Sequence, residues 1–367
     1  MMVEGKDIPS HRDRLWKAEH FAQPDRLPLA FGIYPGLVIR QGREIADLMR
    51  RYDFDSGPVD ISAEESRELN PDYEEEDTDD WGVGWRHIKE GHLGQPIRHP
   101  LEDWSAMATF TLPPGPPAMS GKAFEEAKAQ TELRKREYMV GGGAPTIGGL
   151  CFFERMQWLR GFEHLMYDLV ELPPQIIDLA DRIVEWNRSW VEYNLALGVD
   201  QVGFADDWGT QERLMISPTR WREFFKPRYA RMFEPAVKTG VQVHMHSDGV
   251  ILDILEDWMD VGVSSFRPQF SCHRLEDMAK IVWGRAAIHA DVDRQGIMPF
   301  GTPEQVRQLV KHIIDVFGHP DGGLIGPGEA MSDVPIENVK AALDAWVYYG
   351  GEYWNERRRK GLIEPPK

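Results

Sequence analysis

The chain has 367 residues, 42% of them hydrophobic, and a formal net charge of −18. A chain this acidic is not expected to bind nucleic acid, because phosphates attract basic surfaces. It contains no run of about 18 apolar residues, so no membrane-spanning helix is expected. It has only two cysteines, and residues 1–21 lack the apolar stretch of a signal peptide, which together favour a cytoplasmic protein.

The expected elements begin with a strand at 27–33 and a helix at 42–52. An acidic, Trp-containing excursion follows, in which residues 72–80 are expected to form a solvated loop. Beyond about residue 137, short apolar strands alternate with amphipathic helices, which is typical of repeated βα units around a parallel sheet. Six further strands are expected, at 138–141, 201–205, 241–246, 263–266, 286–290 and 323–326.

Two of the intervening helices have clear start and stop signals. Ser217 and Thr302 each precede a proline, a combination that suits an N-cap followed by the first helical residue. Gly240 and Gly318 mark the expected ends of these helices.

These elements predict an α/β fold, a (β/α)8 TIM barrel. The length also fits two domains, but the first strand would then lack neighbours in its sheet. We therefore expect one domain over 1–367, with an irregular acidic and Trp-containing insertion at about 53–118. Most of the 13 tryptophans are expected to fill the core.

Polar side chains gather at the ends of four expected strands. In the segment 241–249, His244 and His246 project to one face, because side chains alternate along a strand. In a barrel these groups would meet at one mouth with the acidic residues that follow the other strands, Asp206, Asp207, Asp291, Asp293 and Glu329. His246, Asp248 and Glu329 can supply three metal ligands and leave an open position. The plainer alternative is that the histidines are core groups and the carboxylates cap helices.

Four segments together resemble the uroporphyrinogen decarboxylase-like superfamily, namely Asp206–Gly209, Ser217–Ala236, His244–Gly249 and Pro299–Glu304. The resemblance extends over nearly the whole chain. It implies a (β/α)8 barrel with its site at the C-terminal mouth, in agreement with the fold that the periodicity predicts.

The superfamily has two chemistries. Decarboxylation of uroporphyrinogen uses N-terminal arginines to hold carboxylates, but the segment 29–36 reads LAFGIYPG and contains none, so that substrate is not expected. Zinc-dependent methyl transfer with a corrinoid uses a His-x-Cys motif and a later cysteine. The matching positions here are His246, Asp248 and Glu329. The resemblance therefore implies a site for zinc or another divalent metal, with oxygen in place of sulfur at two ligands.

We accordingly expect a metal-dependent methyltransferase that demethylates a small O- or N-methylated substrate. Its partner would be a corrinoid protein that carries cobalamin, and a homodimer is implied by resemblance only. Two alternatives stay open: a metal-free decarboxylase or lyase acting on a substrate other than uroporphyrinogen, and a non-catalytic barrel that binds a corrinoid or tetrapyrrole. Catalytic roles are predicted for Asp206, Asp207 and His244, and substrate contacts for Tyr34, Phe152, Phe153 and Trp208.

Overall fold

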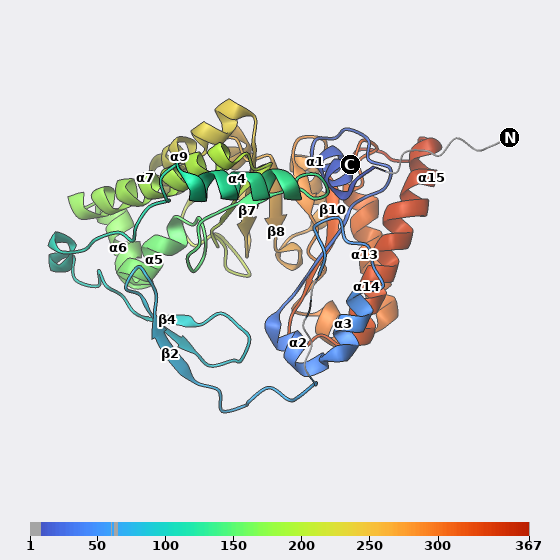
Figure 1. The fold of residues 1–367 in the computed structure, drawn as a ribbon, viewed down its shortest axis with the longest axis horizontal. Helices are drawn as coiled ribbons and strands as arrows, with labels where there is room; N and C mark the ends of the chain where they lie inside the picture. The colour runs from blue at the N-terminus through green and yellow to red at the C-terminus, as the bar shows by residue number, and fades with distance from the viewer. Residues whose placement is uncertain (1–8, 60, 62–64, 367) are drawn as a thin grey trace.

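A seven-stranded parallel sheet forms the centre of the protein (Figure 1). The computed structural model describes residues 9–59, 61 and 65–366. The strand order is β1-β10-β9-β8-β7-β6-β5, so the first strand of the chain pairs with the last. The strands are β1 (Leu29–Ile33), β5 (Gly141–Gly142), β6 (Gln201–Ala205), β7 (Gln242–Ser247), β8 (Ser265–Pro268), β9 (Ala287–His289) and β10 (Leu324–Ala330).

All seven predicted strands are present, which confirms the TIM-barrel-like α/β fold. Within the described residues, β1 and β5 do not pair with each other. This gap lies where a complete eight-stranded barrel would have its second strand. The sheet therefore curls into a barrel that is open along one side.

Helices cover the outer face of the sheet. The longer ones are α1 (His11–Glu19), α4 (Lys122–Arg134), α5 (Phe153–Arg160), α6 (Phe162–Glu171), α7 (Pro174–Leu197), α9 (Lys226–Thr239), α10 (Leu252–Asp260), α11 (Leu275–Val282), α13 (Pro303–Phe317) and α14 (Ile336–Tyr348). The shorter ones are α2 (Pro35–Gln41), α3 (Arg43–Met49), α8 (Pro218–Arg220), α12 (Ile297–Phe300) and α15 (Trp354–Arg359). None of the helices in the described part of the chain is long and apolar enough to cross a membrane.

The helix starts predicted at Ser217 and Thr302 and the helix end predicted at Gly240 are confirmed. The Ser217 hydroxyl accepts a hydrogen bond from the Arg220 N–H, and Thr302 forms a reciprocal capping box with Gln305. Gly240 ends α9 with a φ of 74°, a left-handed conformation that glycine adopts without strain. The predicted helix at 42–52 is α3, which is shorter at its C-terminal end.

The predicted insertion contains a second, antiparallel sheet that the sequence did not indicate. It consists of β2 (Glu75–Thr78), β3 (Gly84–His87) and β4 (Gln95–Arg98). The acidic stretch expected as a loop is strand β2, all four residues of which are exposed. Residues 60 and 62–64, which belong to the predicted insertion of about 53–118, lie outside the described residues.

The loop between β3 and β4 reaches the side of the barrel mouth formed by β1 and β10. Its His92 Nε2 lies 2.6 Å from the Ser332 hydroxyl, and its imidazole ring lies against the ring of Tyr34. Glycines allow the close approach, since a β-carbon on Gly91 would strike the backbone of Gly36. The insertion therefore contacts the side of the mouth that β1 and β10 form.

Large aromatic side chains fill the space between sheet and helices, as predicted for the tryptophans. Seven tryptophans are among the largest fully buried side chains, Trp81, Trp85, Trp208, Trp221, Trp258, Trp346 and Trp354. Cys151 is also buried in this core, and burial raises the pKa of its thiol.

A buried ion-pair cluster anchors β1 in the sheet. The Asp55 carboxylate is fully buried and accepts a hydrogen bond from the Leu29 N–H at 2.7 Å. Arg14 and Arg26 each donate to the same carboxylate at 2.7 Å, and His11 lies 3.0 Å from it. One aspartate thus joins α1 and β1.

We expect Asp55→Ala to lower the free energy of unfolding by about 3 kcal/mol, because loss of one member of a buried ion pair leaves its partner's charge uncompensated. Urea unfolding followed by circular dichroism measures this. Asp53→Ala is the matched control, since the Asp53 side chain is 80% exposed and pairs with His11. Equal losses in the two variants would contradict the anchoring role of Asp55.

Candidate metal centre at the barrel mouth

The strand register sets the polar inner face of the barrel. His246 on β7 lies beside Arg267 on β8, and one layer deeper His244 lies beside Ser265. Partners in a parallel register project to the same side of a sheet. The valine and methionine that alternate with these histidines are buried on the other side. The predicted alternation along β7 is therefore confirmed.

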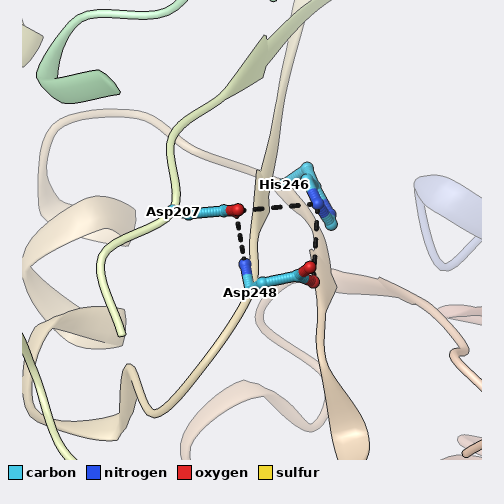
Figure 2. Close-up of side chains that lie close together, drawn as sticks. All are labelled: Asp207, His246 and Asp248. Atoms are coloured by element: carbon cyan, nitrogen blue, oxygen red, sulfur yellow. Dashed lines mark hydrogen bonds and ion pairs between the residues drawn. The ribbon is translucent and has the colours of Figure 1, made fainter. Parts of the chain in front are cut away.

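Three side chains from two strand ends converge at the mouth (Figure 2). Asp207 follows β6, His246 lies near the end of β7, and Asp248 follows β7. One ligand atom from each lies within 4.8 Å of the other two. His246 Nε2 is 3.8 Å from Asp207 Oδ1 and 3.6 Å from Asp248 Oδ1. An imidazole and two carboxylates thus face one shared point.

The donor set fits a divalent cation. His246 Nδ1 lies 2.8 Å from the Arg267 carbonyl oxygen, so it must carry the hydrogen and donate it. This arrangement leaves the Nε2 lone pair directed at the two carboxylates. In many metal sites a carbonyl group fixes the ligating histidine ring in the same way. One nitrogen and two oxygens leave open positions and suit zinc as well as other divalent metals.

Glycines and main-chain hydrogen bonds hold the two ligand loops together. The Asp248 N–H donates to Asp207 Oδ1 at 2.7 Å, and the Gly209 N–H donates to the Asp248 carbonyl at 3.2 Å. A β-carbon on either Gly209 or Gly249 would strike the backbone of the other loop. The positions of both carboxylates are thus set by main-chain packing.

Glu329, the third ligand that the resemblance implies, is not a member of this group. Its Oε1 accepts a hydrogen bond from Arg294 at 2.7 Å, and its Oε2 lies 2.5 Å from Arg267 Nη2. Arg294 also donates to Asp248 Oδ1, so it bridges two of the predicted ligands. Burial alone would raise the pKa of Glu329, but Arg267 and Arg294 hold it below its ordinary value. Its role as a ligand stays a prediction.

Asp206 lies in the core rather than at the mouth. Its carboxylate is fully buried and accepts hydrogen bonds from the main-chain N–H groups of Phe152 and Glu154 and from the Tyr229 hydroxyl. Burial raises the pKa of Asp206 to about 7. These contacts position the start of α5, and a catalytic role for Asp206 stays a prediction.

The predicted aromatic contacts fall into two groups. Phe152, Phe153 and Trp208 are all fully buried, and Phe153 stacks on Trp208 with ring centroids 3.9 Å apart. Tyr34 precedes α2 and is partly exposed at the mouth. Burial, followed by the nearby Glu329 carboxylate, raises the pKa of its hydroxyl. Of the four, only Tyr34 is placed to touch a bound molecule.

His244 lies inside the barrel, below the metal group. Its Nδ1 is 2.9 Å from the Ser265 hydroxyl, and its ring packs edge-on against His289 at 4.7 Å. Burial, with His289 and Arg267 nearby, lowers the pKa of His244 well below its ordinary value, so it is neutral. His244 therefore lies one layer deeper in the barrel than His246, and a catalytic role for it stays a prediction.

The sequence reasoning missed three charged residues of the site: Glu154, Arg267 and Arg294. Arg267 lies near the end of β8 and is the register partner of His246, so it projects to the same inner face, and strand alternation could have indicated this. Arg294 lies in the irregular turn after β9, and Glu154 lies in α5 beside the aromatic pair. Neither Arg294 nor Glu154 lies in a stretch whose periodicity would predict an inward-facing side chain.

A buried carboxylate without a hydrogen-bond partner lies next to this group. Asp291 is 2% exposed, and neither of its oxygens has a hydrogen-bond partner among the described residues. Its nearest cation is Arg294, whose Nε is 3.6 Å away. Burial raises the pKa of Asp291 to about 7. Arg294 and Arg267 oppose this rise, whereas the carboxylates of Asp248 and Glu329 add to it.

We expect Asp291→Asn to change how stability depends on pH. The folded pKa of Asp291 exceeds the unfolded value of about 4, so wild-type stability falls as the pH rises from about 4 to about 7. The variant cannot ionise there, so its melting temperature relative to wild type should rise between about pH 4 and pH 7. Asp333→Asn, at an exposed aspartate, is the control. A difference that does not vary with pH would disprove this.

A model of the family described as "Uroporphyrinogen decarboxylase (URO-D)" matches residues 128–348. Uroporphyrinogen decarboxylases from Psychromonas ingrahamii and Neisseria gonorrhoeae are 24% and 23% identical to the chain over 182 and 225 residues. These matches cover 47% and 58% of this chain, and 48% and 57% of the two relatives. The chain thus spans about half the length of the curated relatives it matches.

Among solved structures, a methyltransferase from Methanosarcina mazei matches with a TM-score of 0.59 and 16% identity. The match covers 92% of this chain and 98% of that one, and at this identity it concerns the fold alone. The family match spans more than half of the chain and includes every strand of the large sheet except β1. This chain therefore belongs to the uroporphyrinogen decarboxylase (URO-D) family.

Proposed function

We propose that this protein is a metal-dependent methyltransferase that demethylates a small O- or N-methylated substrate and passes the methyl group to a corrinoid protein. The observation that carries the proposal is the convergence of Asp207, His246 and Asp248, with the free nitrogen of His246 turned toward both carboxylates. The overall likeness to the Methanosarcina mazei methyltransferase supports it. The absence of arginine from β1 argues against a substrate with many carboxylates.

Asp207, His246 and Asp248 would hold zinc or another divalent cation. Such a cation, when bound, draws electron density from the oxygen or nitrogen that carries the methyl group and so makes that atom a better leaving group. The residues around it keep the site aligned. The Arg267 carbonyl fixes the His246 ring, and Arg294 holds the Asp248 carboxylate.

Glu154 is the proposed proton donor to the departing oxygen or nitrogen. Burial, reinforced by the carboxylates of Asp207 and Asp206, raises the pKa of Glu154 well above its ordinary value. A carboxyl group whose pKa is raised in this way keeps its proton to a higher pH than an ordinary glutamate and can act as a general acid. Asp206 accepts a hydrogen bond from the Glu154 N–H at 2.9 Å, so we assign it a positioning role.

The second candidate is a metal-free decarboxylase or lyase. The names of the two matched relatives favour it. In that case the carboxylates and His246 would stabilise charge by hydrogen bonding alone. The two functions differ in whether activity needs a metal.

We expect the purified protein to bind about one divalent ion per chain, and His246→Ala and Asp207→Asn to weaken binding on the order of 10-fold or more, because each removes a ligand. Metal analysis and competition with a zinc indicator measure this. Glu329→Gln is the matched variant. In wild type the Glu329 carboxylate pairs with Arg267 and Arg294, so its substitution should leave the metal affinity nearly unchanged. Wild type without metal would rule out the proposal, and a comparable loss in Glu329→Gln would make Glu329 a ligand.

Metal-loaded protein should methylate a reduced corrinoid protein when supplied with a panel of methyl ethers and methylamines. Visible absorption of the corrinoid follows the reaction. Glu154→Gln is expected to reduce kcat on the order of 100-fold while keeping the metal, because only the proton donor is lost. Activity that survives chelation would instead favour the decarboxylase or lyase. Stoichiometric corrinoid binding without turnover would favour a non-catalytic carrier.

A further inference from the structure

The inside of the barrel contains a cavity of about 250 Å³, and Arg267, the register neighbour of His246, is part of its wall. Side chains from β1, β8 and β9 line it, including Ala30, Gly32, Arg267 and His289. The cavity exists because β1 presents its smallest side chains to the barrel interior. A β-carbon on Gly32 would lie 3.2 Å from the Glu329 Cβ, so even alanine would crowd this space.

Arg267 is the cationic wall of this cavity. Its Nη2 pairs with Glu329 at 2.5 Å, but its Nε and Nη1 have no hydrogen-bond partner within the described part of the chain. The side chain is 30% exposed, so these donors are accessible. A guanidinium with free N–H groups is matched to a carboxylate, which it binds through charge-assisted hydrogen bonds.

His289 adds a second polar group to the wall. Its Nε2 lies 2.7 Å from Glu19, which leaves Nδ1 without a hydrogen-bond partner among the described residues. The surrounding Ala30, Gly32 and Gly328 offer no competing charge. The free N–H donors of Arg267 therefore lie on the β8 side of the cavity, and the apolar part of a bound molecule would lie against β1 and β10.

From these contacts we infer that the substrate is a small carboxylic acid whose carboxylate binds Arg267 in the barrel interior. This inference rests on the proposed function, because it directs the methylated end of the substrate toward Asp207, His246 and Asp248. The register places Arg267 directly beside His246, so one small molecule can reach both groups. The cavity is smaller than the usual range of about 300–1,000 Å³ for ligand sites, which restricts the acid to a compact one.

Calorimetric titration of the full-length, metal-loaded protein with benzoate, and with benzamide as its neutral counterpart, tests the inference. We expect benzoate to bind at least about 10-fold more tightly than benzamide, since only its carboxylate can accept charge-assisted hydrogen bonds from Arg267 with both oxygens. Arg267→Gln should remove this preference. Ala30→Leu, which fills the cavity and keeps the charge, should weaken benzoate and benzamide alike.

Arg285→Gln is the matched control, because Arg285 is an exposed arginine that pairs with Glu256 away from the mouth. No benzoate binding to wild type, or binding that is unchanged in Arg267→Gln, would overturn the inference. Inorganic phosphate, titrated in parallel, shows whether the site selects a carboxylate; tighter binding of phosphate than of benzoate would also overturn it.

Metal content measured on the same samples separates the two proposals. Protein that binds metal but shows no Arg267-dependent benzoate binding would refute the carboxylate site and leave the proposed function standing. Protein without metal that still binds benzoate through Arg267 would refute the proposed function and retain the carboxylate site.

Discussion

The geometry of the barrel mouth depends on Arg294. Parallel strands all end at this mouth, and they bring Asp248, Asp291 and Glu329 close enough to repel one another. Arg294 is 7% exposed and forms ion pairs with all three carboxylates. Burial alone would lower the pKa of this guanidinium, but the three carboxylates raise it above its ordinary value. A cluster of partly buried carboxylates is tolerated only where such a partner compensates it.

Local patterns in the sequence were enough to predict the sheet. The strands that contain His246 and Glu329 are short apolar runs bounded by turn residues, and each was found within a few residues of its expected place. The exception is the antiparallel sheet β2–β4. Its first strand reads Glu-Glu-Asp-Thr and is exposed along its whole length, so it lacks the apolar alternation that indicates a strand.

The composition of the site was harder to predict for a physical reason. Strand parity correctly placed His246 inward, but it gives no information about which ion pairs form between distant segments. Glu329 meets Arg294 and Arg267, which are 35 and 62 positions away in the chain, and only the folded structure brings them together. Phe153 and Trp208 were also ambiguous, because an aromatic residue after a strand can face either the core or the mouth.

The paired glycines at positions 209 and 249 have a consequence for how this family can diversify. They fix the main chain around Asp248 without using its side chain, which is about one third exposed. A cysteine could therefore replace the aspartate with little change in backbone position. In the proposed metal centre, such an exchange would replace an oxygen ligand by sulfur and change the preferred metal, while the barrel that carries the site stays the same.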